Sequence, residues 1–214
     1  TDHAAIPAND RIQALLRPEG WSDVRYDVQS SSLSFSSDAV TLNFGAVAKG
    51  YISDEMKKVL EVDAKNMTAT SALMSLGGNV MTLGTKPDGS SWTVAITDPF
   101  SPESLMGSVT VTGQAVVTSG NYEKYFEENG KRYHHILDPC TGAPSESDVV
   151  STTIIADKGI DCDALSTATF LMGADAGMQL IDSLDGIEAV FIQSDGSVVT
   201  SKHIDKYQLQ VNNS

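Results

Sequence analysis

The sequence has little positive charge. Its 214 residues include 14 Lys and Arg against 28 Asp and Glu, which gives a formal net charge of −14 at pH 7. Such a charge repels polyanions, so it argues against nucleic acid or an anionic membrane surface as a partner. A small anionic ligand would need local help from a lysine, from backbone N–H groups or from a divalent cation.

The sequence also lacks long apolar runs and has few cysteines. No stretch of 18 apolar residues is present, which predicts no membrane-spanning helix, and no signal peptide is visible in TDHAAIPAND. Cys140 and Cys162 are too few for a disulfide framework and lack metal-site spacing, so two free thiols are the first expectation. Without an initiator methionine, a mature product, a trimmed form and part of a longer polypeptide all stay open.

What is present is typical of an ordinary globular protein. The chain is 41% hydrophobic and 20% charged, without fixed-period repeats, and its length predicts one domain over residues 1–214. Hairpins alternate with strand–helix units, which predicts an α+β fold of mixed, largely antiparallel sheets packed with helices.

Apolar periodicity places the elements. Period-two stretches predict strands at 24–28, 32–35, 39–44, 71–76, 79–84, 91–98, 108–113, 115–119 and 149–156, and hairpins at 122–137 and 188–201. Helical spacing predicts helices over 9–17, capped by Asn9 or Asp10, over 46–61, 161–173 and 174–184. In the second helix Val47, Tyr51, Val59 and Leu60 recur at helical spacing.

Two glycine-containing turns are candidate anion sites. In NFGAVAKG, Gly45 would free the backbone before a helix whose N-terminus and Lys49 could hold a phosphate. In LGGN, Gly77 and Gly78 would let a ligand approach the backbone closely. Each has a plainer alternative, a tight turn with a surface lysine in the first and an ordinary strand–strand turn in the second.

Hydroxyl and carboxylate groups supply a candidate cation site. In DCDALSTATF, Asp163 and Thr167 lie four residues apart, so a helix presents both on one face, and Mg²⁺ prefers such hard oxygen ligands. A helix cap or a local side-chain bond is the plainer alternative. The stretch TSGNYEKYF adds Ser119 and Gly120 just before the hairpin, and its two tyrosines are expected in the core or in hairpin pairs.

The stretch YHHILDPCTG, Tyr133 to Gly142, forms the second arm of the predicted hairpin and the loop beyond it. His135 can titrate near neutrality and Asp138 could orient it, which suits acid–base work or a hydrogen bond to a phosphate. Because side chains alternate along a strand, His134 and His135 point to opposite faces. An exposed or structurally satisfied histidine is the alternative.

Taken in order, these stretches resemble the ApbE family, flavin transferases that move FMN from FAD onto proteins. The family pattern runs Asp-Leu-Gly-(Gly/Ala)-Ile-Ala-Lys-Gly-Tyr, Leu-Gly-Gly-Asp/Asn, Thr-Ser-Gly-x-Tyr, His-x-x-Asp-Pro-x-Thr-Gly and Asp-Ala-Leu-(Ser/Ala)-Thr-Ala. This chain has NFGAVAKGY, LGGN, TSGNY, HILDPCTG and DALSTA in the same order.

The resemblance implies a Mg²⁺ site formed by the backbone carbonyl of Ala46 with Asp163 and Thr167. It implies catalytic roles for His135 and Asp138 beside the FAD pyrophosphate, with His135 rather than His134 facing the ligand. The FAD-binding residues would be Gly45, Lys49, Gly77, Gly78, Ser119, Gly120 and Thr141. FMN would pass to a threonine of an acceptor flavoprotein with release of AMP, or FAD would be hydrolysed to FMN and AMP. Resemblance also implies a location in the cell envelope, outside the cytoplasm.

This sequence departs from the family pattern in three respects. Asn43 replaces the usual aspartate and leaves only an amide to hold the turn, and Cys140 replaces a residue that is often arginine. The chain resembles the family's C-terminal two-thirds, so activity would need the remaining wall of the flavin site from an oligomer or another chain, unless the short TDHAAIPAND arm suffices. A flavin-binding or scaffold protein without turnover is therefore the alternative. Because the resemblance puts Cys140 and Cys162 near one site, it also raises a disulfide between them as a hypothesis.

Overall fold

The computed structural model describes residues 5–16, 20–61 and 69–212. In chain order its elements are α1 (Asn9–Leu15), η1 (Gly20–Asp23), β1 (Val24–Asp27), β2 (Ser32–Phe35), α2 (Ala48–Glu61), β3 (Ala72–Leu76), β4 (Asn79–Leu83), β5 (Trp92–Thr97), β6 (Leu105–Val111), β7 (Ala115–Gly120), β8 (Tyr125–Glu128), β9 (Lys131–His134), β10 (Val149–Ala156), α3 (Gly159–Met172), α4 (Ala174–Asp182), β11 (Glu188–Gln193), β12 (Val198–Thr200), η2 (Ile204–Tyr207) and β13 (Gln210–Val211). The predicted α+β class is confirmed.

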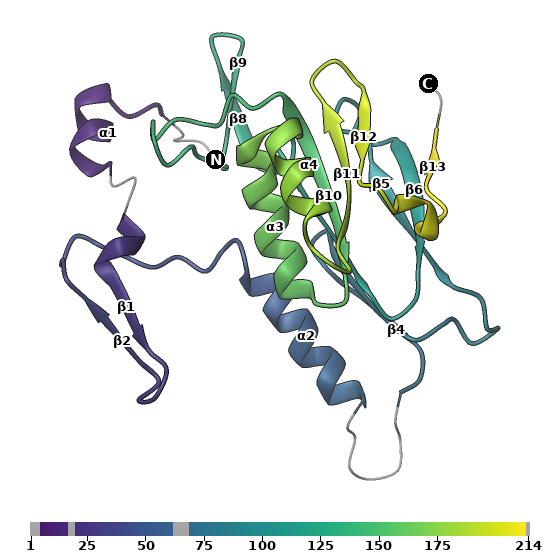
Figure 1. Cartoon of the computed structure of the whole chain (residues 1–214). Coiled ribbons are helices and arrows are strands. Elements are labelled where there is room, and N and C mark those ends of the chain that lie inside the picture. Colours follow the sequence, from purple (N-terminus) through teal and green to yellow (C-terminus); the bar gives the residue numbers. More distant parts are fainter. Residues whose placement is uncertain (1–4, 17–19, 62–68, 213–214) are drawn as a thin grey trace.

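Three layers form the body of the molecule. A six-stranded antiparallel sheet, in the order β12-β11-β10-β7-β4-β3, carries α2, α3 and α4 on one face. The small sheet β13-β6-β5 covers the other face (Figure 1). Strand β10 lies in the middle of the large sheet, and all eight of its residues are buried. Burial on both faces explains why its sequence, VVSTTIIA, is mostly β-branched and lacks alternation between apolar and charged residues.

Each face of the large sheet has its own apolar core. Phe170 and Phe191 belong to the cluster between the helices and the sheet, whereas Ile155 and Ile192 belong to the cluster between the two sheets. Neighbouring residues of β10 and β11 thus enter different cores, as the pleat requires. The order of hairpins and helices in the sequence predicted antiparallel sheets packed with helices, and the structure adds the arrangement in three layers.

Helix α2 packs against α3 through glycine, not through a large apolar face. A Cβ on Gly50 would lie 2.1 Å from the Gly159 carbonyl oxygen, and a Cβ on Gly159 would lie 2.2 Å from Ser53 Oγ. The helical spacing of apolar residues in α2 suggested another face, but Tyr51 and Val59 are 53% and 72% exposed. Small residues at the crossing bring the two backbones together, and this brings the first turn of α2 close to α3.

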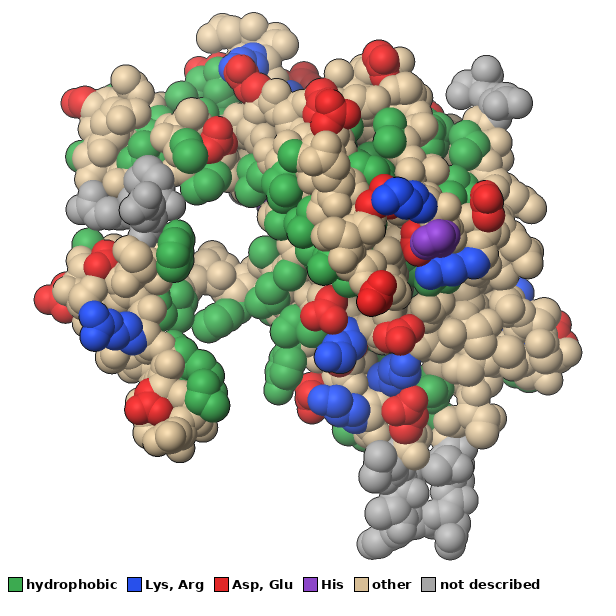
Figure 2. Space-filling model, in the orientation of Figure 1, with side chains coloured by type: hydrophobic (Ala, Val, Ile, Leu, Met, Phe, Trp, Pro, Cys, Tyr) green, Lys and Arg blue, Asp and Glu red, His purple; other side chains and the backbone are tan. Residues whose placement is uncertain are grey.

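The segment from residue 5 to residue 47, here called the N-terminal arm, is built differently. Its elements α1, η1, β1 and β2 contain no buried residue among those described. Figure 1 shows the β1–β2 hairpin standing away from the helices, and Figure 2 shows a hollow between them lined by hydrophobic side chains.

Two predictions for the arm were wrong. Residues 39–44 form no strand, because no neighbouring strand among the described residues supplies hydrogen-bond partners for their backbone N–H and C=O groups. Helix α1 begins after Ala8, which makes no side-chain cap, so neither Asn9 nor Asp10 is the cap. The Asp10 carboxylate instead accepts a hydrogen bond from the adjacent Arg11 N–H. In the described parts of the chain, every helix is too short or too polar to cross a bilayer.

Candidate active site

The turn before α2 holds the first candidate anion site. Asn43 Oδ1 accepts a hydrogen bond from Gly45 N–H at 2.7 Å, so the amide does hold this turn. A Cβ on Gly45 would lie 2.9 Å from that oxygen, and Gly45 is absent from the described glycines with positive φ. Space, and not the left-handed backbone freedom expected from the sequence, favours glycine here. Ala46, the predicted carbonyl ligand, is exposed in the same turn.

Lys49 joins this turn to the second glycine motif. Its ammonium group donates a hydrogen bond to the Gly77 carbonyl oxygen at 3.3 Å. Gly77 and Gly78 have φ values of 57° and 88° and close the tight turn between β3 and β4. Both are in the left-handed region, where glycine is favoured because it has no Cβ. Two motifs 28 residues apart in the sequence thus form one wall.

Helix α3 supplies the predicted cation ligands. Asp163 is only 4% exposed, and its Oδ2 accepts a hydrogen bond from Gly50 N–H in the first turn of α2 at 2.8 Å. Ser119 Oγ, near the end of β7, lies 2.8 Å from Ser166 Oγ and 3.3 Å from Thr167 Oγ1. The structure therefore brings together the first turn of α2, one face of α3 and the end of β7.

These donors fit a hard divalent cation with few protein ligands. No group of three or more His, Cys, Asp and Glu suited to a metal occurs in the described part of the chain. A cation beside Asp163 would rely on one carboxylate, a hydroxyl such as that of Thr167, a backbone carbonyl, water and substrate phosphate. Mg²⁺ commonly binds in this way, since it keeps several waters and takes one or two carboxylates.

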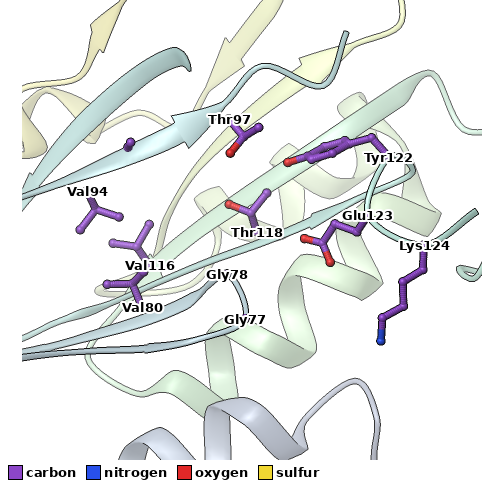
Figure 3. A pocket seen from close by; sticks show the side chains of 11 residues that line it. Gly77, Gly78, Val80, Val94, Thr97, Val116, Thr118, Tyr122, Glu123 and Lys124 are labelled. Carbon is purple, nitrogen blue, oxygen red and sulfur yellow. The ribbon is translucent and has the colours of Figure 1, made fainter. Parts of the chain in front are cut away.

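A cavity of about 430 Å³ opens beside the double-glycine turn. Three valines, Val80, Val94 and Val116, form its apolar wall, and Thr97, Thr118 and Tyr122 add hydroxyls. Figure 3 shows the Glu123 carboxylate pointing toward Thr118, while Lys124 points away. The sequence suggested that Tyr122 lies in the core or in a hairpin pair, but it lines this cavity. Gly120 is needed here because a Cβ would lie 2.3 Å from the Tyr122 ring.

Glu123 is a site residue that sequence reasoning missed. Enclosure by the cavity walls raises the pKa of its carboxyl, while the charges of Lys49 and His135 act to lower it. The negative charge of Asp163 also raises the pKa of Glu123. Glu123 thus lies within electrostatic reach of three predicted site residues. Its only sequence signal is an acidic residue directly after TSGNY.

The two histidines do occupy opposite sides of β9 and its end. The His134 side chain is 7% exposed, and its Nε2 donates a hydrogen bond to the Ser145 carbonyl oxygen at 3.1 Å. Its ring contacts the Phe170 ring edge-on, and burial lowers the pKa of the imidazole. His135 is exposed, and its Nδ1 lies 3.3 Å from the Lys124 carbonyl oxygen. Because a carbonyl only accepts, Nδ1 carries the proton and Nε2 of the neutral ring is left as a proton acceptor.

Asp138 and Thr141 form hydrogen bonds within their own loop. Asp138 Oδ1 accepts a hydrogen bond from Cys140 N–H at 2.7 Å, and Thr141 Oγ1 accepts one from Ala143 N–H at 3.3 Å. The Lys124 carbonyl, and not Asp138, holds the His135 ring. The charges of both His135 and Lys49 act on Glu123, whereas Thr141 contacts only its own loop in the bonds described above.

The hypothesis of a disulfide is wrong for this structure. Cys140 is an exposed free thiol, and Cys162 is a free thiol with no exposed surface. Cys162 lies on the face of α3 that packs against the sheet, where its thiol points to the Ala115 carbonyl at 3.8 Å. The resemblance suggested that Cys140 and Cys162 are close together. They do not pair, because Cys162 faces the core and Cys140 faces solvent.

Comparison with known proteins identifies the family. The sequence profile of the ApbE family matches residues 1–191. The FAD:protein FMN transferase of Klebsiella pneumoniae is 38% identical over 189 residues, which cover 88% of this chain and 56% of that protein. The solved ApbE protein of Thermotoga maritima is 29% identical with a TM-score of 0.83, over 96% of this chain and 65% of that one.

A second solved structure agrees. The apo flavinyl transferase ApbE of Pseudomonas stutzeri is 32% identical with a TM-score of 0.77, over 95% of this chain and 62% of that one. The chain thus spans between a half and two thirds of the length of these relatives. With the family profile matching most of its sequence and its fold superimposing on solved members, the chain belongs to the ApbE family.

Proposed function

We propose that this chain transfers FMN from FAD to a threonine hydroxyl of an acceptor protein, with Mg²⁺ as cofactor. The observation that carries the proposal is the convergence of Lys49, Asp163 and the Ser119–Thr167 pair around the helix side of the sheet, where Lys49 binds the double-glycine turn that also lines the cavity. Relatives named FAD:protein FMN transferase support it.

The reaction exchanges the phosphoanhydride link of FAD for a phosphoester link to the acceptor. The hydroxyl oxygen forms a bond to the FMN phosphorus, and the bond from that phosphorus to the oxygen bridging to AMP breaks. AMP leaves with the electron pair, and the hydroxyl loses its proton. Such transfers depend mainly on positioning and on stabilising charge at the phosphoryl oxygens.

Each residue then has a role that follows from its position. Lys49, in the first turn of α2, attracts the pyrophosphate in a protein whose charge would otherwise repel it. When bound at Asp163 and Thr167, Mg²⁺ supplies neutralisation of the phosphate charge. His135 accepts the hydroxyl proton at Nε2, since Nδ1–H is engaged with the Lys124 carbonyl.

Hydrolysis of FAD to FMN and AMP is a second activity that the same site supports. His135 is exposed, so water can reach the atom that would accept a proton. Attack by water replaces attack by threonine, while the leaving group stays the same. Which product forms then depends on whether an acceptor protein occupies the open side of the site.

The test is incubation with FAD and Mg²⁺, with and without a threonine-containing acceptor peptide, followed by mass spectrometry of peptide and nucleotides. FMN on the peptide supports the transferase, and free FMN with AMP supports hydrolysis alone. FAD that binds but stays intact in all conditions contradicts turnover by this chain and favours a flavin-binding protein, or an enzyme completed by another chain or its own oligomer.

Two variants make the test specific. Asp163→Asn keeps an oxygen for Gly50 N–H but removes the charge that a cation needs, so turnover should fall at least 100-fold in a folded protein. Lys58→Met is the control for loss of a charge away from the site, because Lys58 lies on the same helix as Lys49 but forms an exposed ion pair with Glu55. Its turnover should equal that of the unchanged chain.

A further inference from the structure

Asn79 is a buried polar residue without hydrogen bonds. It has no exposed surface, and neither its amide nitrogen nor its amide oxygen has a partner among the described residues. Burying an amide unpaired destabilises a fold. A buried group of this kind, placed by the fold beside a functional site, indicates a ligand that completes its bonding.

The pleat of β4 determines which way Asn79 faces. Met81, two residues along, packs in the cluster between the sheet and the helices, whereas Val80 lines the cavity on the opposite face. Asn79 therefore lies on the helix side, where α2 and α3 both pack against β4. It is directly opposite Val117 in the pairing with β7.

That position adjoins the candidate cation site. Ser119, two residues beyond Val117, is on the same face and contacts Thr167 of α3. Immediately before β4, the Gly77 carbonyl binds Lys49. The unpaired amide thus lies on the sheet surface beneath the site formed by Asp163, Thr167 and the first turn of α2.

We propose that Asn79 is a positioning residue of the cation site, whose amide makes its hydrogen bonds when a hydrated divalent cation lies beside Asp163. This inference rests on the proposed Mg²⁺ site and extends it to the layer behind the ligands. A polar group in that layer orients ligands and bound water, and its loss typically weakens metal affinity about 10- to 100-fold. Without the cation the same amide only destabilises the fold.

The experiment measures thermal stability of the full chain without metal and then in MgCl₂ titrations at fixed FAD. Asn79→Leu, of similar volume, should raise the melting temperature of the metal-free protein. It should also weaken Mg²⁺ affinity about 10- to 100-fold, seen as a smaller Mg²⁺-induced shift in melting temperature. Asn79→Asp, which keeps an acceptor, should retain the Mg²⁺ response.

Thr82→Val is the matched control on the same strand. Thr82 also has no exposed surface, but its hydroxyl donates to the Gln114 carbonyl and accepts from Gln114 N–H. This control should therefore lower the metal-free melting temperature and leave Mg²⁺ affinity unchanged. The two nearly isosteric changes on β4 are thus expected to move stability in opposite directions.

The outcomes separate this inference from the proposed function. If the unchanged chain shows no response to Mg²⁺, the proposed cation site fails and the role of Asn79 falls with it. If the unchanged chain responds and Asn79→Leu responds equally, only the role of Asn79 is overturned. A lower metal-free melting temperature for Asn79→Leu would also overturn it, because the amide would then already be satisfied, for example by buried water.

Discussion

The N-terminal arm and the body of this protein use similar residues in opposite ways. In the body, Phe170 and Phe191 have at most 1% of their surface exposed, whereas Phe35 and Tyr26 of the arm are 47% and 61% exposed. Both regions form regular hydrogen-bonded strands. The difference teaches that secondary structure in the arm rests on local pairing, while in the body it is reinforced by two packed cores.

The candidate site lies where the two regions meet. Its lysine, carboxylate and hydroxyls come from α2, α3 and β7, but the turn at Asn43 and Ala46 is the last segment of the arm. Stability should therefore depend almost entirely on the body. Function should depend on how the arm enters α2.

The largest expected difference comes from removing one aromatic ring in each region. Phe191→Ala should lower the free energy of unfolding by about 3–5 kcal/mol, because it leaves a cavity in the core. Phe35→Ala on β2 should change it by no more than about 0.5 kcal/mol. Urea unfolding of both variants measures this, and equal losses would mean that the arm is packed against something in solution.

Two glycines give the next contrast. Gly50→Ala puts a Cβ against the backbone of Gly159, which cannot move easily, and should destabilise by about 1–3 kcal/mol. Gly45→Ala meets only the end of the Asn43 side chain, which can rotate away. The melting temperature should therefore fall clearly for Gly50→Ala and little for Gly45→Ala. The reverse order would show that α2 and α3 are not in close contact.

Two carboxylates, Glu188 in the body and Asp27 in the arm, allow the pH dependence of stability to be compared between the regions. Burial acts to raise the pKa of Glu188, but hydrogen bonds from Ser201, Lys206 and His203 N–H outweigh it, so the net pKa is lowered. A carboxyl whose folded pKa is depressed stabilises the protein above its unfolded value, about 4.3, and loses that effect as pH falls through the folded pKa.

Glu188→Gln should thus cost about 1–2 kcal/mol at pH 7 and make stability less dependent on pH below about 4.3. Asp27 in the arm also has a lowered pKa, through hydrogen bonds from Ser30, but it is fully exposed, so Asp27→Asn should change the same curve much less. Denaturant unfolding from pH 3 to pH 7 measures both. Parallel curves for Glu188→Gln and the unchanged chain would rule out this role for Glu188.

The smallest effect concerns the two thiols. Cys140 should react with a thiol reagent in the native protein, whereas Cys162 should react only after unfolding, since burial excludes the reagent and raises the pKa of its thiol. Cys140→Ser should change stability by no more than about 0.5 kcal/mol. Finding no reactive thiol in the native protein without reductant would restore the disulfide.

Local sequence patterns predicted most of the body well. Alternation in 79–84 and 115–119, the Asn129-Gly130 turn and the helical spacing after Asp161 correspond to β4, β7, the β8–β9 hairpin and α3. β4, β7 and α3 contain apolar residues that the fold buries, whereas in β8 and β9 only His134 is buried and the Asn129-Gly130 turn was the signal. The same reasoning failed at residues 39–44, where alternation has no sheet to join, and at Tyr51 and Val59, whose helical face lies in solvent.

By itself, the sequence determined most of the elements, the order of the motifs and the family, because period and residue type are local properties of the chain. Only the tertiary structure decided which groups meet. The hydrogen bond from Gly50 to Asp163 joins residues 113 apart, and it exists because two glycines let α2 and α3 approach closely. The raised pKa of Glu123 and the unpaired amide of Asn79 likewise depend on surrounding layers that no local pattern records.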